Sequence, residues 1–167
     1  MQFFVGDKVI HPRYGPGEIT SIEGQGHSDA EGRYYVIDIP RQGLTVHTPV
    51  GRADALGIRP AMSPSRSRRI VSMLRGRAHV LPEDYRARQE KISAQLGSGQ
   101  VAQVASVVRD LSWHQKRSHL TKRDSDLLRH VLDLLSAEMA LVSGDPVSEV
   151  KQLIGATLTA AMAGADS

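Results

Sequence analysis

The stretch that decides the first half of the fold is Tyr34-Tyr35-Val36-Ile37-Asp38-Ile39. It is rich in aromatic and β-branched residues, which favour strands, and the side chains of a strand alternate between its two faces. Tyr35, Ile37 and Ile39 therefore share one face, which we expect to line a core, and the other three residues share the opposite face. The alternation predicts a β-strand with one buried face.

Four more short runs of the same kind surround this strand, over residues 3–5, 8–11, 17–22 and 45–48. Turn-forming residues separate them: Gly6-Asp7, Pro12, Gly15-Pro16-Gly17, the interval from Gly24 to Gly32, and the interval from Pro40 to Gly43. Four or five strands within fifty residues fit a small barrel of the SH3-like or Tudor-like type. The last strand of so small a sheet can lie at an edge.

From residue 63 onward the apolar residues recur with the helical period. Helix starts are predicted at Ser63-Pro64, at Leu81 to Asp84, near Val101, at the capping-box-like Thr121 to Asp124, and at Asp145-Pro146. Asp124 and Asp126 are interpreted as structural acids in a first helical turn, where negative charge favours the helix dipole. The prediction is an α+β protein with a barrel over 1–52, a linker over 53–62 and a bundle of about five helices over 63–167.

The charge is unevenly distributed along the 167 residues, although the formal net charge is only +3. Residues 1–62 sum to −1, residues 63–123 hold thirteen Lys or Arg against four carboxylates, and residues 124–167 sum to −5. A basic middle of this kind indicates a polyanion partner for that segment. A solvated basic helical surface is the alternative interpretation.

Nothing in the sequence suggests catalysis. Cysteine is absent, which excludes disulfides, thiolate metal sites and cysteine nucleophiles. The histidines do not have metal-ligand spacing: His11, His27, His47 and His79 are dispersed, and His114 and His119 are five residues apart. No cofactor loop, secretory signal or apolar membrane-spanning run is present. We therefore expect a cytoplasmic, non-enzymatic monomer without cofactor or metal.

Three segments resemble one known family. The first is Phe4-Val5-Gly6-Asp7-Lys8-Val9-Ile10-His11-Pro12-Arg13-Tyr14-Gly15-Pro16-Gly17, the second is Leu44-Thr45-Val46-His47-Thr48-Pro49-Val50, and the third comprises Gly99 and Val107-Val108-Arg109-Asp110-Leu111. In order and spacing they are similar to the CarD/CdnL family of bacterial transcription regulators, over about residues 1–160. The first module also resembles one found in the transcription-repair coupling factor.

The resemblance implies a non-enzymatic factor that binds RNA polymerase. In that family the barrel adds its edge strand to the lobe of the polymerase β subunit, which implies Leu44, Thr45, Val46 and His47 as the contact. His47 stands where the family often has arginine. The alternative is that residues 44–50 form an ordinary barrel strand.

The resemblance also implies that the helical domain contacts promoter DNA at the upstream edge of the melted bubble. The family places a tryptophan wedge in the minor groove fourteen residues before the position of Gly99, and Tyr85 stands there in this sequence. Phosphate contacts are implied for the surrounding basic residues Arg75, Arg77, Arg86, Arg88 and Lys91.

Several alternatives stay open. Tyr85 can instead be an aromatic residue that packs on the bundle, and we interpret Trp113 as a packing residue. Five further basic residues are divided evenly between DNA contact and solvated surface: Arg66, Arg68, Arg69, Lys116 and Arg117. A second hypothesis for the whole chain is a general nucleic-acid-binding protein that acts without polymerase, with the salt dependence that its basic segment would give.

Overall fold

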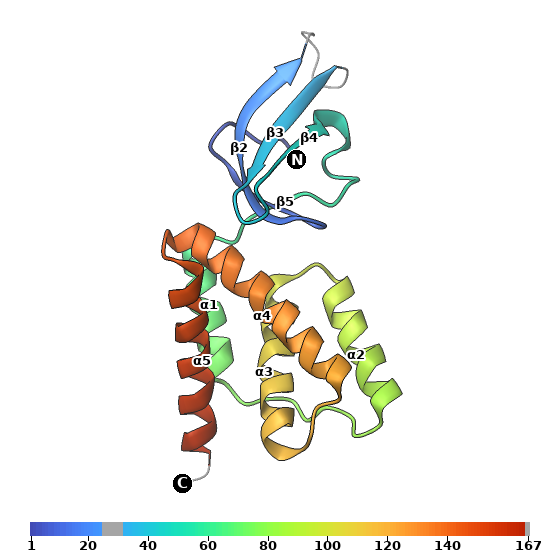
Figure 1. Cartoon of the computed structure of the whole chain (residues 1–167), viewed down its shortest axis with the longest axis vertical. Helices are drawn as coiled ribbons and strands as arrows, with labels where there is room; N and C mark the ends of the chain where they lie inside the picture. The colour runs from blue at the N-terminus through green and yellow to red at the C-terminus, as the bar shows by residue number, and fades with distance from the viewer. Residues whose placement is uncertain (25–31, 166–167) are drawn as a thin grey trace. The chain divides into compact units, whose positions relative to one another are not determined.

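The N-terminal half of the chain forms an antiparallel sheet, in a computed structural model that describes residues 1–24 and 32–165 (Figure 1). Within the described residues the sheet has five strands: β1 (Lys8–His11), β2 (Gly15–Gly24), β3 (Arg33–Ile39), β4 (Leu44–Pro49) and β5 (Arg59–Pro60). Their order is β4-β3-β2-β1-β5, so β4 is an edge strand, as the sequence suggested. Part of the expected turn between Gly24 and Gly32, including His27, lies outside the described residues.

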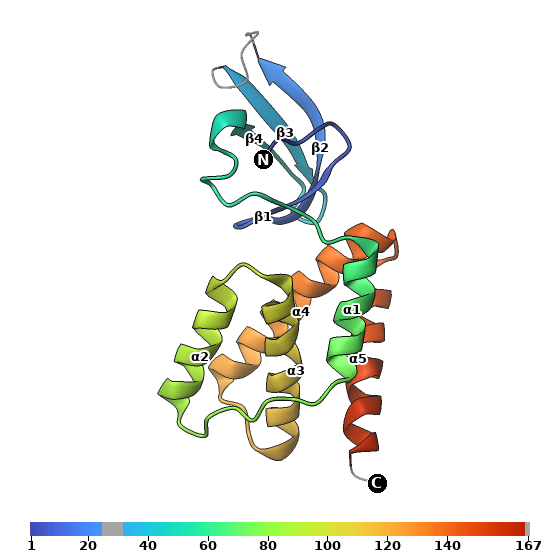
Figure 2. The same ribbon diagram turned by 180° about the vertical axis from the view of Figure 1, so that it is seen from behind.

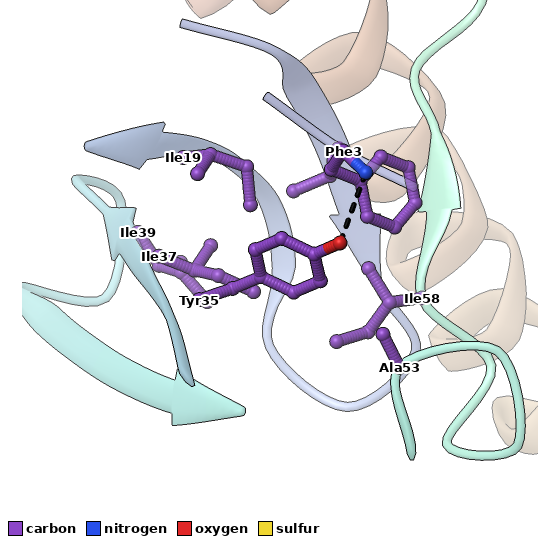
Figure 3. Packing of buried hydrophobic residues seen from close by; sticks show 8 residues of the cluster. Phe3, Ile19, Tyr35, Ile37, Ile39, Ala53 and Ile58 are labelled. Atoms are coloured by element: carbon purple, nitrogen blue, oxygen red, sulfur yellow. Dashed lines mark hydrogen bonds between the residues drawn. The ribbon is translucent and has the colours of Figure 1, made fainter. Parts of the chain in front are cut away.

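The core of this unit lies on the predicted face of β3. Tyr35, Ile37 and Ile39 are all buried, and they pack with Phe3, Val9, Ile19, Ala53 and Ile58 (Figure 3). The Tyr35 hydroxyl accepts a hydrogen bond from the backbone N–H of Phe3 at 3.0 Å, and the two rings meet edge to face with centroids 5.6 Å apart. The expected strand over residues 3–5 is wrong. This segment leads directly into a turn, in which Gly6 has φ +92°.

The expected linker over 53–62 is also wrong, because these residues belong to the sheet unit. Ala53 and Ile58 are in its core, and Arg59–Pro60 forms the strand that pairs with β1. A 3-10 helix (η1, Val50–Arg52) precedes them, and Gly57, at φ +83°, lies in the turn before β5. Gly57 therefore belongs to a turn, and Pro60 belongs to the last short strand, which follows that turn. The first compact unit of the chain comprises Met1–Met62 and is joined by Leu141–Gly144, and the second starts at Ser63.

The second unit is helical and, in the part of the chain described, contains α1 (Pro64–Arg75), α2 (Tyr85–Gly97), α3 (Val101–Arg117), α4 (Lys122–Ser143) and α5 (Val147–Gly164). The α+β class is thereby confirmed. The two predicted caps are present, and Asp84 caps the second helix, which starts just after the expected Leu81 to Asp84. The side chains of Ser63, Asp84 and Thr121 accept hydrogen bonds from backbone N–H groups in the following first turn, at 3.2, 2.9 and 3.1 Å. α3 packs against α1, α2 and α5.

The helix directions bring several termini to one end of this unit. α1 and α3 run toward that end, and α2 and α4 start from it, as the two opposite views show (Figures 1 and 2). We call this the lower end, after its place in Figure 1. It contains the last turn of α3, the end of the connector over residues 76–84 and the first turns of α2 and α4; the last turn of α1 lies beside the middle of α3, where Arg109 donates to the Met73 carbonyl.

Candidate nucleic-acid interface and exposed strand edge

The first candidate site is the outer side of β4. Val46 lies opposite Ile37 of β3, so its side chain is on the core face, where it is half-buried against the core. Thr45 and His47 have their side chains on the other face and are exposed, and Leu44 near the start of the strand is exposed as well. Three of the four residues implied for polymerase binding are therefore accessible.

The backbone of β4 is the second feature of this edge. In the sheet of the described residues, β4 pairs with β3 on one side only. Alternate N–H and C=O groups of an antiparallel edge strand point away from the sheet and can pair with a further strand. The edge is therefore suited to a partner that supplies a β-strand.

The second candidate site is the lower end of the helical unit. Arg75 comes from the last turn of α1, Arg77 from the connector and Arg86 from the first turn of α2, and all three are exposed. Lys91 is also exposed, but it lies on α2 about 9 Å along the axis from the helix start. Arg86 thus lies at the lower end, whereas Arg75 and Arg77 flank segments that are bonded to the middle of α3, through Met73 and His79. Lys91 lies farther along α2.

Tyr85 is the first residue of α2 and also lies at the lower end. Its side chain is half-buried, and the guanidinium carbon of Arg88 lies 5.8 Å from its ring centroid. Asp84 caps the helix immediately before it. Tyr85 therefore has a fixed backbone position and a partly accessible ring.

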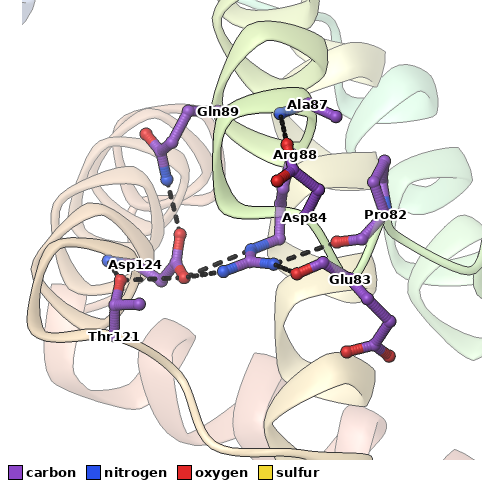
Figure 4. A network of polar contacts seen from close by, with 8 residues as sticks. All are labelled: Pro82, Glu83, Asp84, Ala87, Arg88, Gln89, Thr121 and Asp124. Atoms are coloured by element: carbon purple, nitrogen blue, oxygen red, sulfur yellow. Dashed lines mark hydrogen bonds and ion pairs between the residues drawn. The ribbon is translucent and has the colours of Figure 1, made fainter.

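Arg88 does not lie on this surface. It is only 4% exposed, and its three guanidinium nitrogens are all engaged (Figure 4). Nε and Nη2 donate to the Asp124 Oδ2 atom at 3.2 and 2.9 Å, and Nη1 donates to the carbonyls of Pro82 and Glu83 at 2.9 and 3.0 Å. The expected phosphate contact by Arg88 is therefore wrong. Arg88 lies one turn before the buried Ile92, so the helical period directs both toward the interior.

Asp124, at the start of α4, is the buried partner of Arg88. It is fully buried and also accepts a hydrogen bond from the Thr121 hydroxyl at 2.9 Å. Burial acts to raise the pKa of Asp124, but the hydrogen bonds from Arg88 and Thr121 and the Arg88 charge outweigh it, so the pKa lies below the usual range. Asp124 has the expected structural role, through an ion pair with α2 that the sequence did not indicate.

The lower end also carries basic residues that the sequence argument left open or did not use. Lys116 and Arg117 in the last turn of α3, and Lys122 and Arg123 in the first turn of α4, are all exposed. The Lys116 and Arg117 cations lie 5.8 and 5.6 Å from the ring centroid of Trp113, which is half-buried as a packing residue would be. The predicted helix start at Thr121 to Asp124 could have revealed this surface. It leaves only a short turn between α3 and α4, and a short turn brings the two basic pairs together.

The described residues hold neither a metal-binding cluster nor a membrane-spanning helix. Residues 1–24 and 32–165 contain no group of three or more histidine and acidic side chains arranged to hold a metal ion. No helix in the same residues combines the length and apolar character needed to cross a membrane.

These features define a binding protein of two units, one with an open strand edge and one with a basic end. The family model for the CarD C-terminal domain matches residues 69–155, and the model for the CarD-like/TRCF RID domain matches residues 3–62. The chain therefore belongs to the CarD family. It is 26% identical over 153 residues to "Putative transcription factor YdeB" of Bacillus subtilis (strain 168). The matched region covers 89% of this chain and 97% of that protein.

Membership of this family assigns the chain to transcription regulation. It also implies interaction with RNA polymerase in general terms, and CarD-like factors are generally non-enzymatic regulators.

Proposed function

We propose that the chain docks on the β subunit of RNA polymerase through β4 and stabilises the open promoter complex by contacting DNA at the upstream edge of the bubble. The observation that carries the proposal is the position of β4 at the edge of the sheet. Its exposed residues include Leu44, Thr45 and His47. Such a protein would act in the cytoplasm, where it meets polymerase and promoter DNA.

The proposed polymerase contact is the addition of a strand to β4. Backbone hydrogen bonds would supply much of the affinity, and side chains on alternate positions would supply specificity. Leu44 would contribute apolar contact, whereas Thr45 and His47 would contact the partner from the opposite face. Because histidine offers fewer donors than arginine, the contact at position 47 would be weaker than an arginine could make.

The proposed DNA contact combines stacking with phosphate binding. The ring of Tyr85 would stack on a distorted base step and oppose closure of the duplex, although its area is smaller than that of an indole. Arg86 would bind a phosphate beside it. Arg75 and Arg77 near the end of α1, Lys91 farther along α2 and the pairs on α3 and α4 would extend the surface. Phosphate contacts position a protein without reading bases, so promoter choice would depend on polymerase and bubble shape.

The two contacts would support each other because they belong to one chain. Docking on polymerase raises the effective concentration of the helical unit at the promoter, so neither contact needs high affinity alone. A monomer suffices for this mechanism.

The direct test is co-elution with core RNA polymerase on size exclusion without DNA. N–H groups of adjacent residues on one strand point to opposite sides, so one of Thr45→Pro and Val46→Pro removes an N–H that faces β3 and the other removes an outward one. Thermal denaturation identifies the variant that keeps the fold. We expect that variant, and His47→Asp, to lose co-elution, whereas Arg59→Ala at the opposite edge keeps it. Co-elution of all folded variants at wild-type levels would contradict the docking mode.

The basic end also supports a second candidate, a nucleic-acid-binding protein that acts without polymerase. That protein would bind DNA alone with a steep salt dependence and would not respond to substitutions on β4. Absence of co-elution together with salt-sensitive DNA binding would favour it.

A further inference from the structure

Two buried charged side chains hold the connector between α1 and α2 against α3. Arg109 and Asp110 are 6% and 1% exposed, although they are charged. The Asp110 Oδ1 atom accepts from the backbone N–H of His79 at 3.0 Å and from the Arg109 Nε at 2.9 Å. The Arg109 Nη1 donates to the carbonyl of Met73, near the end of α1, at 3.3 Å. The pair therefore attaches both the end of α1 and the connector to α3.

The other carboxylate oxygen of Asp110 is incompletely satisfied. Oδ2 is buried and has no hydrogen-bond partner among residues 1–24 and 32–165. The His79 Nδ1 lies 3.4 Å from it, and the same ring nitrogen lies 3.4 Å from the Arg109 Nη2. A guanidinium can only donate, so in the contact with Arg109 the Nδ1 must accept. Without a hydrogen, Nδ1 faces Oδ2 as a second acceptor, and with one it can donate to Oδ2; the His79 side chain is 67% exposed, so water reaches the ring.

Protonation of His79 would change this arrangement at one atom. The added proton on Nδ1 would make that nitrogen a donor to Oδ2 of Asp110 and would end its role as acceptor from Arg109. The charged groups that face the ring are Arg109 and Asp110 from α3; α1 contributes the Met73 carbonyl to the cluster, and Arg77 lies two residues earlier on the connector. Arg109 would keep its bonds to Asp110 and to Met73.

We propose that His79 is a proton-controlled positioning residue that, when charged, ties the connector to Asp110 by a second bond and so fixes Arg77 for phosphate binding. This inference rests on the proposed DNA contact of the helical unit. Ala78 and Leu81 bury their side chains in either state, whereas Val80 is 71% exposed. The connector therefore stays in place and the bond from His79 changes only its local mobility, so we expect a modest effect.

The structural half of the test needs no DNA. Exchange of the His79 backbone amide is followed by NMR in the full chain between pH 8 and pH 5.5, the range in which histidines titrate, with correction for intrinsic exchange. We expect protection to rise about three- to tenfold on acidification in the wild type and to stay constant in His79→Gln. His119→Gln is the matched control, because His119 is exposed on the same unit but is not in the cluster, and it should behave as the wild type. Equal pH profiles for wild type and His79→Gln would overturn the proposal.

The functional half uses fluorescence anisotropy with a short DNA duplex that contains a mismatched bubble, at constant ionic strength. We expect affinity to rise about three- to fivefold from pH 8 to pH 5.5, with most of the rise lost in His79→Gln and kept in His119→Gln. Binding with the same pH profile in wild type and His79→Gln would refute the inference and leave the proposed function intact. Absence of DNA binding, or binding indifferent to Arg86→Ala, would instead refute the proposed function.

Discussion

Removal of the Arg88 guanidinium is predicted to destabilise the helical unit far more than removal of its neighbour Arg86. Arg88→Ala would leave the fully buried Asp124 without its cation and would free the carbonyls of Pro82 and Glu83. Removal of one partner of a buried ion pair lowers the free energy of unfolding by about 3–5 kcal/mol. Truncation of an exposed side chain such as Arg86 lowers it by about 0.5 kcal/mol or less.

Two further variants separate charge from geometry. Arg88→Lys keeps the charge but cannot reach Asp124 and both carbonyls with one ammonium group, so we expect a loss of about 1–3 kcal/mol. Replacement of the whole pair, Arg88→Met with Asp124→Leu, leaves no buried charge and should cost less than Arg88→Ala alone. The double variant is therefore the test of whether the unpaired acid, and not the lost side-chain volume, causes the damage.

The assay is urea denaturation followed by the fluorescence of Trp113, which is the only tryptophan in the chain and lies on α3. A probe within the helical unit is needed because two units need not unfold together. A midpoint for Arg88→Ala that equals the midpoint for Arg86→Ala would refute the argument that Arg88 is a buried anchor.

The same pair predicts a dependence on pH. The pKa of Asp124 is lower in the folded chain than its ordinary value of 3.8, so the unfolded chain binds the proton first on acidification. The stabilisation is present above the unfolded pKa and is lost as pH falls through the folded pKa. In Asp124→Asn this part of the acid destabilisation should disappear; an unchanged acid profile would contradict the assignment.

Three predictions concern the sheet unit. Tyr35→Phe removes the acceptor of the Phe3 N–H and should cost about 1–3 kcal/mol in thermal denaturation; no loss would exclude that bond as a stabilising one. Gly17→Ala would place a Cβ 2.6 Å from a backbone oxygen of β3 and should lower the free energy of unfolding by about 1–3 kcal/mol. Wild-type stability would show that β2 and β3 can shift apart to make room for the methyl group. Burial, and to a lesser extent Arg13, lowers the pKa of His11, so stability should fall as pH drops below 6.5, and His11→Asn should reduce that fall; an identical profile would refute it.

The helices could be predicted well because their starts depend on local chemistry. Ser63, Asp84 and Thr121 each accept a hydrogen bond from the following turn, and a cap of this kind needs only neighbouring residues. The core face of β3 could be predicted for the same reason, since alternation within six residues determines which side chains share a face.

The errors arose where tertiary contacts decide the outcome. The two-residue strand Arg59–Pro60 exists because β1 offers it a partner, and no pattern in two residues reveals that. The family resemblance implied Arg88 as a phosphate contact beside Tyr85, whereas its position one turn before Ile92 places it inside, where Asp124 from a distant helix neutralises it. The sequence suggested an edge position for β4, which the strand order confirms, whereas the meeting of α2, α3 and α4 termini at the lower end required the helix directions.

The most direct test of the account is the lifetime of the open promoter complex after a competitor is added, measured with the protein present and absent. We predict that the wild-type chain lengthens this lifetime, that Tyr85→Ala loses most of the effect while it retains polymerase binding, and that the folded β4 proline variant has no effect. A lifetime that the wild-type chain does not change would contradict the account. So would a lifetime that Tyr85→Ala and the β4 variant extend as much as the wild type.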